Sequence, residues 1–192
     1  MTTAQPVRLL GITGSLRAKS FNTAALRTFA ALLPAGVALE IADLADIPFY
    51  NADVEQGGLP EAVKALRSRV TAADGLVFAV PEYNFSVPGV LKNALEWLSR
   101  PPSPPCHGKP CAMLGATLSP LGTARGQFHL RHICVSLNLI PVNTPHVDIT
   151  SAAAKFDPEG KLTDSASIDA IRQLAGELIT LTRSLSVRHG SN

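Results

Sequence analysis

The stretch Gly11-Ile12-Thr13-Gly14-Ser15-Leu16-Arg17-Ala18-Lys19-Ser20-Phe21-Asn22 stands between an apolar run that begins at Val7 and a helical pattern that begins at Thr23. The apolar run is typical of a buried parallel strand. A strand that leads through a polar loop into a helix suits an anion, because the first-turn backbone N–H groups are free and the helix dipole is positive there. The sequence therefore predicts an anion site at this loop.

The side chains of the loop add donors to those of the backbone. They are the hydroxyls of Ser15 and Ser20, the Asn22 amide and the Arg17 guanidinium. A phosphate monoester needs many donors, and charge-assisted bonds from an arginine contribute roughly 1.5–3 kcal/mol each. We interpret the loop as a pocket for a terminal phosphate. The alternative is an ordinary strand-to-helix turn, with Asn22 as the N-cap and Arg17 in solvent.

The composition indicates one globular domain over residues 1–192, with flexible tails at 1–6 and 186–192. The chain is 46% hydrophobic and 17% charged, which separates it from disordered sequences. A net charge of +2 without a Lys/Arg cluster argues against a nucleic-acid partner. No apolar stretch approaches the roughly 20 residues of a membrane span. The polar residues 1–6 lead straight into a strand, so we expect a cytoplasmic protein without a secretory signal.

Strand and helix patterns alternate along the chain. Strands are predicted at 8–13, 37–43, 76–80, 111–117 and 140–147, and helices at 23–33, 60–73, 88–98, 127–139 and 165–185. A long loop is expected at 46–58 and a proline-rich linker at 100–110. This order predicts an α/β protein, in which a doubly wound parallel sheet has helices on both faces. Ligands of such sheets bind at the carboxyl ends of the strands, where the loops at 13–22, 81–87 and 118–123 should converge.

The loop Pro81-Glu82-Tyr83-Asn84-Phe85-Ser86-Val87-Pro88-Gly89 places two aromatic side chains directly after the most apolar strand. A rigid aromatic loop suits a flat heteroaromatic ligand, with Asn84 or backbone groups at its edge. Core packing of Tyr83 and Phe85 above the sheet is the alternative. Neither a dinucleotide G-x-G-x-x-G fingerprint nor a Walker loop is present.

Three cysteines, Cys106, Cys111 and Cys134, form an odd set without C-x-x-C spacing. They do not combine with the histidines into a zinc pattern, so no metal site is predicted. We expect reduced, partly buried thiols, with Cys106 in the proline-rich segment as the most exposed of them.

Several motifs resemble the NADPH-dependent FMN reductase family, and most of all its bacterial quinone/chromate reductases. They are Gly14-Ser15-Leu16-Arg17-x-x-Ser20-x-Asn22, Pro81-Glu82-Tyr83-Asn84, Pro88-Gly89-x-Leu91-Lys92-Asn93-Ala94-x-x-Trp97 and Gly122-x-x-Arg125-x-Gln127-x-x-Leu130-Arg131. The resemblance extends from residue 7 to about residue 185. It implies a flavodoxin-like, three-layer α/β/α fold with a five-stranded sheet in the order 2-1-3-4-5, and a non-covalent FMN.

The resemblance also implies which residues hold the FMN. The phosphate would bind Ser15, Arg17, Ser20 and Asn22, with backbone groups of Leu16, Phe21 and Thr23. The ribityl chain and ring would lie along Pro81, Glu82, Tyr83, Asn84 and Phe85. Thr117 and its loop would approach the pyrimidine end of the ring; relatives usually carry more Gly and Ser in this loop. Glu82 is expected to cap a helix or touch the ribityl chain, and no catalytic side chain is named.

The implied activity is that of a flavoprotein oxidoreductase that reduces quinones with NADPH or NADH. Hydride transfer through flavin N5 in a ping-pong cycle would supply the chemistry, and chromate, ferric complexes and azo dyes would be side substrates. Four cations are candidates for the NADPH 2′-phosphate, namely Arg17, Arg100, Lys109 and Arg125, although Lys109 is otherwise expected to be solvated. A homodimer or homotetramer is implied, with the Trp97 helix as a contact; ordinary burial of Trp97 is the alternative.

Two other functional classes compete with this interpretation. A flavodoxin-type electron carrier would never meet a nicotinamide, but such carriers tend to be acidic and this chain has a net charge of +2. The other class is a flavin-loaded binding module or redox sensor.

Overall fold

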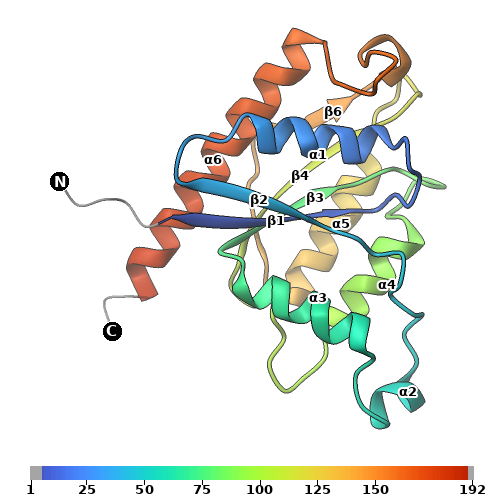
Figure 1. Ribbon diagram of the computed structural model, residues 1–192, viewed down its shortest axis with the longest axis vertical. Helices are drawn as coiled ribbons and strands as arrows, with labels where there is room; N and C mark the ends of the chain where they lie inside the picture. Colours follow the sequence, from blue (N-terminus) through green and yellow to red (C-terminus); the bar gives the residue numbers. More distant parts are fainter. Residues whose placement is uncertain (1–5, 190–192) are drawn as a thin grey trace.

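The computed structural model describes residues 6–189, and these form a parallel sheet between two layers of helices (Figure 1). The strands follow the order β2-β1-β3-β4-β5, and β6 pairs with β4 beyond the end of β5. They are β1 (Val7–Thr13), β2 (Val37–Ala42), β3 (Gly75–Ala79), β4 (Pro110–Ala116), β5 (Ile140–Pro141) and β6 (Val147–Ile149). The predicted flavodoxin-like α/β fold and its strand order are confirmed.

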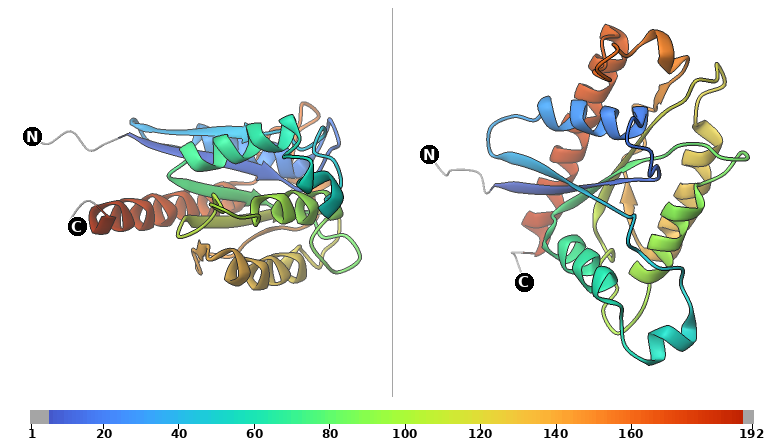
Figure 2. Two further views of the ribbon diagram at one scale, coloured as in Figure 1. Left: turned by 90° about the horizontal axis from the view of Figure 1, so that it is seen from below. Right: turned by 45° about the vertical axis from the view of Figure 1, so that its right-hand side comes forward.

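Helices α1 and α6 cover one face of the sheet, and α3, α4 and α5 cover the other (Figures 1 and 2). The helices are α1 (Phe21–Ala31), α2 (Ala52–Gln56), α3 (Glu61–Ala72), α4 (Gly89–Leu98), α5 (Ala124–Leu137) and α6 (Ser165–His189), with a 3₁₀ turn η1 (Ala152–Ala154). Every residue of β3 and β4 is buried, as expected for central parallel strands that are covered on both faces. Successive residues of these strands enter opposite cores, so that Val77 faces α1 and α6 while Phe78 faces the other layer.

The predicted last strand, 140–147, is divided into two short strands. Proline has no backbone N–H and cannot donate to a sheet ladder. Pro141 ends β5, Pro145 lies in the gap, and the chain rejoins β4 only at Val147. The interruption lets β6 extend the sheet beside the carboxyl end of β4, where Val147 pairs with Leu114.

Other boundaries differ in smaller ways. The expected loop at 46–58 contains the short helix α2. Helix α6 continues to His189, beyond the predicted end at 185, while residues 1–5 and 190–192 of the predicted tails lie outside the described residues. Trp97 is fully buried, and its indole N–H donates to the Pro48 carbonyl oxygen at 2.8 Å, so ordinary burial accounts for it.

All three cysteine side chains are buried, so the prediction of an exposed Cys106 was wrong. The proline-rich segment turns back on the core, and burial raises the pKa of the Cys106 thiol to about 12. A hydrogen-bonding contact with Cys134 at 4.0 Å, together with burial, raises the pKa of Cys111 well above its usual value. Over residues 6–189, no helix is long and apolar enough to cross a membrane, and no group of His, Cys, Asp and Glu could hold a metal ion.

Candidate functional site

The loop after β1, residues 14–20, presents many polar groups that the protein itself does not use; we call it the β1 loop. Ser15 is only 5% exposed, yet its hydroxyl has no hydrogen-bond partner among the described residues. Within the same part of the chain, no acceptor meets the backbone N–H groups of residues 16–22. The first turn of α1 carries no acidic residue. These donors surround a place where an anion would satisfy them together.

Ser20, and not Asn22, is the N-cap of α1. The Ser20 hydroxyl oxygen accepts a hydrogen bond from the Thr23 backbone N–H at 3.3 Å. Asn22 instead points into the protein, where its Nδ2 donates to the Ala116 carbonyl oxygen at 2.8 Å and its Oδ1 accepts from the Ala116 N–H at 2.9 Å. This bidentate contact fixes the start of α1 against the carboxyl end of β4. The alternative of Asn22 as N-cap is therefore wrong.

A hollow of about 410 Å³, the first hollow, lies between the β1 loop and the start of α4. Its lining includes Leu16, Arg17 and Tyr83. Leu16 is 57% exposed, and Arg17 is exposed and without a partner among residues 6–189. Gly14 forms the floor, where a Cβ would lie only 2.9 Å from Pro88 Cγ. A glycine at position 14 therefore lets the backbone approach the Pro88 ring.

Residues 81–88, the β3 loop, contain a tight two-residue turn. Tyr83 and Ser86 exchange backbone hydrogen bonds of 3.1 and 3.0 Å, and the two residues between them, Asn84 and Phe85, have φ values of 50° and 64°. The turn holds both aromatic rings outside the core, since Tyr83 is 49% exposed and Phe85 is 63% exposed. The alternative of core packing is therefore wrong, and both rings keep exposed surface.

Glu82 connects the β3 loop to α5. Its side chain is 6% exposed, and its Oε1 accepts a hydrogen bond from Arg125 Nε at 2.6 Å and forms an ion pair with Arg125 Nη2 at 2.5 Å. Its Oε2 accepts from the Gly126 N–H at 3.1 Å, in the first turn of α5. The Arg125 guanidinium carbon lies 3.8 Å from the centroid of the Phe85 ring, within cation–π range. Glu82 thus caps a helix and holds an arginine over an exposed aromatic ring.

A second hollow, of about 400 Å³, opens between the β3 loop and the loop after β4, residues 117–123, which we call the β4 loop. Its lining residues are Glu82, Asn84, Phe85, Thr117, Ser119, Leu121, Gly122 and Arg125. Thr117 continues the line of β4 and donates its N–H to the Ile149 carbonyl oxygen at 2.9 Å. The two hollows lie on either side of the β3 loop, and the loops that follow β1 and β3 project together at one edge of the sheet (Figure 1).

A buried polar network supports the β4 loop from behind. Asp148 Oδ1 accepts from the Thr123 N–H and hydroxyl, both at 2.9 Å, and from Gln127 Nε2 at 3.0 Å. Asp148 was not singled out from the sequence, because its partners are 25 and 21 residues distant. Its position between two apolar residues of a short strand could have indicated a partly buried, hydrogen-bonded aspartate.

The four cations that were candidates for a phosphate contact divide clearly. Arg125 is held by Glu82, and Arg100 donates to Ser99 Oγ at 2.7 Å. Lys109 precedes β4 at the opposite edge of the sheet, where its Nζ donates to the Ala73 carbonyl oxygen at 2.6 Å. The expectation of a solvated Lys109 was wrong, and burial lowers the pKa of this ammonium group. Arg17 alone among the four lies in the β1 loop without a partner in the described chain.

The sequence relationships agree with this arrangement of loops. The family model described as NADPH-dependent FMN reductase matches residues 7–154. The chain belongs to the NADPH-dependent FMN reductase family. Membership makes it an oxidoreductase that works with FMN and a nicotinamide co-substrate, as predicted.

Individual relatives give the same assignment. This FMN reductase family member is 50% identical to an NAD(P)H-dependent FMN reductase of Pseudomonas aeruginosa, over 87% of this chain and 90% of the relative. It is 40% identical to a quinone reductase of Escherichia coli, over 91% of this chain and 93% of the relative. Among solved structures, the flavoenzyme FerB of Paracoccus denitrificans, an NAD(P)H:(acceptor) oxidoreductase, matches with a TM-score of 0.85 at 26% identity, covering 93% of this chain and 98% of that one.

Proposed function

We propose that this member of the family reduces quinones with electrons from NADPH or NADH, and that its FMN lies across the β1, β3 and β4 loops. The observation that carries the placement is the Ser15 hydroxyl, which is buried without a partner beside the unpaired N–H groups of residues 16–22. A buried polar group without a partner costs about 1–3 kcal/mol, so a site that leaves one in place is suited to a ligand that satisfies it. The phosphate of FMN has the oxygen atoms to do so.

The phosphate end of the FMN would bind at the β1 loop. Ser15 and Ser20 would donate hydroxyl hydrogens, and Arg17 would supply positive charge. Backbone N–H groups of Leu16, Phe21, Asn22 and Thr23 would point toward the same place at the positive end of the α1 dipole. The Asn22 side chain uses one amide hydrogen on Ala116, and its second amide hydrogen would be available to the phosphate.

The ring end would lie along the β3 loop and reach the β4 loop. Pro81, Glu82 and Asn84 border this path, and Tyr83 and Phe85 offer exposed aromatic surface to a flat ligand. Thr117 would meet the far end of the ring, where its hydroxyl oxygen already accepts from the Ser119 N–H at 3.2 Å.

FMN held by the β1, β3 and β4 loops would supply the redox chemistry, with hydride transfer at N5 in a ping-pong cycle. The protein would hold the ring between the two hollows and leave one face open to small molecules. No side chain needs to act as a general acid, because a reduced quinone takes protons from water. Both Glu82 oxygens are engaged with Arg125 and Gly126, which leaves this carboxylate a structural role.

We extend the proposal to the range of electron acceptors and to the oligomeric state. An open face favours side activity on chromate, ferric complexes and azo dyes, since an exposed reducing group selects its acceptor weakly. A homodimer or homotetramer in the cytoplasm is the expected form. Exposed apolar side chains at the rim of the hollows, Leu16, Tyr83, Phe85, Leu118 and Leu121, are available for self-association.

Anaerobic spectroscopy tests this function directly. The purified protein should be yellow, should bleach on addition of NADPH or NADH, and should recover its colour when a benzoquinone is added. Bleaching without recovery would point to a reductase with another acceptor. A yellow protein that neither nicotinamide bleaches would favour the electron carrier or the sensor, and would contradict the proposal.

A further inference from the structure

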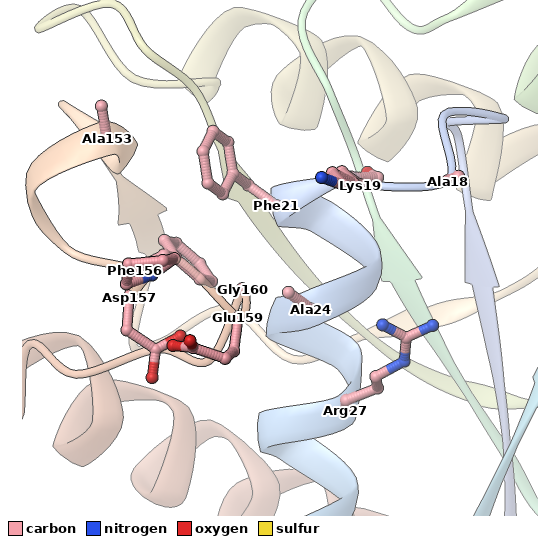
Figure 3. Close-up of a pocket in the computed structure, with 12 residues that line it drawn as sticks. Ala18, Lys19, Phe21, Ala24, Arg27, Ala153, Phe156, Asp157, Glu159 and Gly160 are labelled. Carbon is pink, nitrogen blue, oxygen red and sulfur yellow. The ribbon is translucent and has the colours of Figure 1, made fainter.

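The largest cavity described, about 610 Å³, lies on the outer side of α1 and not at either hollow (Figure 3). Its walls come from the end of the β1 loop, the first turns of α1, and η1 with the loop that follows it. Cavities of roughly 300–1,000 Å³ hold ligands of nucleotide size. The chemistry of this space, which we call the α1 cavity, therefore indicates what kind of ligand it takes.

One wall of the α1 cavity is cationic. Lys19 and Arg27 line it, both are exposed, and neither forms an ion pair or hydrogen bond within residues 6–189. Arg17, at the first hollow, also lacks a partner among residues 6–189, whereas Lys92 and Arg125 are paired with carboxylates. Two unpaired cations in the lining of one cavity favour an anionic ligand such as a phosphate monoester.

The remaining walls are aromatic and acidic. The rings of Phe21 and Phe156 lie 4.9 Å apart at an angle of 42°, and Figure 3 shows them facing each other between α1 and the loop opposite. Asp157 and Glu159 bring carboxylates from that loop, and the Glu159 carboxylate has no partner among the described residues. A flat base with an exocyclic amino group would suit these walls, because the ring contacts the aromatic side chains and the amine donates to a carboxylate.

The α1 cavity is separated from the second hollow by a single turn of chain. The carbonyl oxygens of Thr117 and Ser119, which line the second hollow, accept hydrogen bonds from the N–H groups of Ala152 and Ser151. The next residue, Ala153, lines the α1 cavity. A ligand that reaches over this turn would have one end at each site.

We propose that the α1 cavity binds the adenosine 2′-phosphate end of NADPH while the nicotinamide enters the second hollow. Lys19 and Arg27 contact the 2′-phosphate, Phe21 and Phe156 border the adenine, and Glu159 accepts from its amino group. The proposal rests on the proposed reductase function and adds a preference for NADPH over NADH. That preference was open in the sequence, where Lys19 and Arg27 were not among the candidate cations.

Calorimetric titration of the FMN-loaded protein with two probes tests the site without turnover. The probes are adenosine 2′,5′-bisphosphate and adenosine 5′-monophosphate, which differ only in the 2′-phosphate. We expect the first to bind about 10-fold more tightly, the low end of the range for charge-assisted bonds because both cations are exposed. The preference should shrink as salt is raised.

The double variant Lys19→Gln/Arg27→Gln should bind the two probes within about twofold of each other. The matched control is Lys64→Gln/Arg183→Gln, which removes two exposed cations from α3 and α6 and should keep the preference. In turnover with a quinone, the double variant should raise the KM for NADPH about 10-fold and leave the KM for NADH and kcat unchanged.

Each other outcome overturns the assignment. Equal binding of the two probes by the parent protein, or a preference that survives the double variant, removes the 2′-phosphate from the α1 cavity. Loss of FMN from the double variant would assign the two cations to the FMN phosphate instead. A failure of the proposed reductase function can be distinguished from a failure of this site. Quinone turnover would then be absent, while the protein would still prefer the probe that carries the 2′-phosphate.

Discussion

The β1 loop and the β4 loop lie at the same edge of one sheet, yet they use their polar groups in opposite ways. In the β4 loop, Ser119 accepts from Leu121 at 3.1 Å, and Thr123 is held by Asp148 at 2.9 Å. In the β1 loop and the first turn of α1, the Ser15 hydroxyl and the N–H groups of residues 16–22 have no partner within the described chain. The β4 loop meets much of its hydrogen bonding within the protein, whereas the donors of the β1 loop are left for the proposed ligand. Substitutions in the β4 loop should mainly change stability, and those in the β1 loop should mainly change FMN affinity.

The largest effect is expected from Asn22→Asp, at the point where the two loops meet. The substitution replaces the Nδ2 donor with a carboxylate oxygen, which would face the Ala116 carbonyl oxygen and add negative charge beside the phosphate. We expect largely colourless protein, with FMN content reduced at least about 10-fold. Absorbance at 450 nm against total protein measures it. The control is Asn138→Asp, at the opposite end of the strands, which should keep the FMN content of the parent protein. If Asn22→Asp also kept that FMN content, Asn22 would not belong to the FMN site.

The next effect concerns stability alone. Asp148→Ala leaves the Thr123 N–H and hydroxyl and the Gln127 amide without their common acceptor, and Thr123 is fully buried. Buried donors left unpaired cost about 1–3 kcal/mol each, so we expect a loss of about 3 kcal/mol in the free energy of unfolding. Urea denaturation of the FMN-free protein measures it.

Asp148→Asn is the matched variant, since it keeps an oxygen acceptor at the same position. It should recover at least half of the loss. The FMN dissociation constant of either variant should stay within about threefold of the parent's. A much larger change in FMN affinity would mean that the β4 loop, too, depends on the ligand for its structure.

Arg17→Ala tests the open loop without touching a contact inside the protein. Because Arg17 has no partner within residues 6–189, the unfolding free energy of the FMN-free protein should not change. We expect the FMN dissociation constant to rise about 10–100-fold, as for the loss of one or two charge-assisted bonds. Fluorescence titration of flavin gives the constant. The control is Arg183→Ala, which removes an exposed arginine from α6. Equal FMN dissociation constants for both variants would mean that Arg17 does not contact the FMN.

The same contrast explains which features the sequence predicted. The alternation of strands and helices and the loops that carry Ser15, Arg17 and Tyr83 follow from local patterns, because apolar runs and loop motifs are readable over about ten residues. The strand order was implied by the family resemblance. The pairing of Asn22 with Ala116 and of Glu82 with Arg125 joins residues 94 and 43 positions apart, which no local pattern specifies. For Cys106 the local pattern was misleading. Its proline-rich surroundings indicate an exposed surface loop, but tertiary packing buries the side chain.

The smallest effect separates two serines of the β1 loop. Ser15→Ala removes a buried hydroxyl that has no partner, so the FMN-free protein should gain about 1 kcal/mol of unfolding free energy. Ser20→Ala removes the N-cap bond to the Thr23 N–H and should lose about 1 kcal/mol. Both should weaken FMN binding, by about 10-fold for Ser15→Ala. Opposite signs in stability with the same sign in affinity are the expected signature of a loop that is built for its ligand; a loss of stability in Ser15→Ala would mean that its hydroxyl already serves the fold.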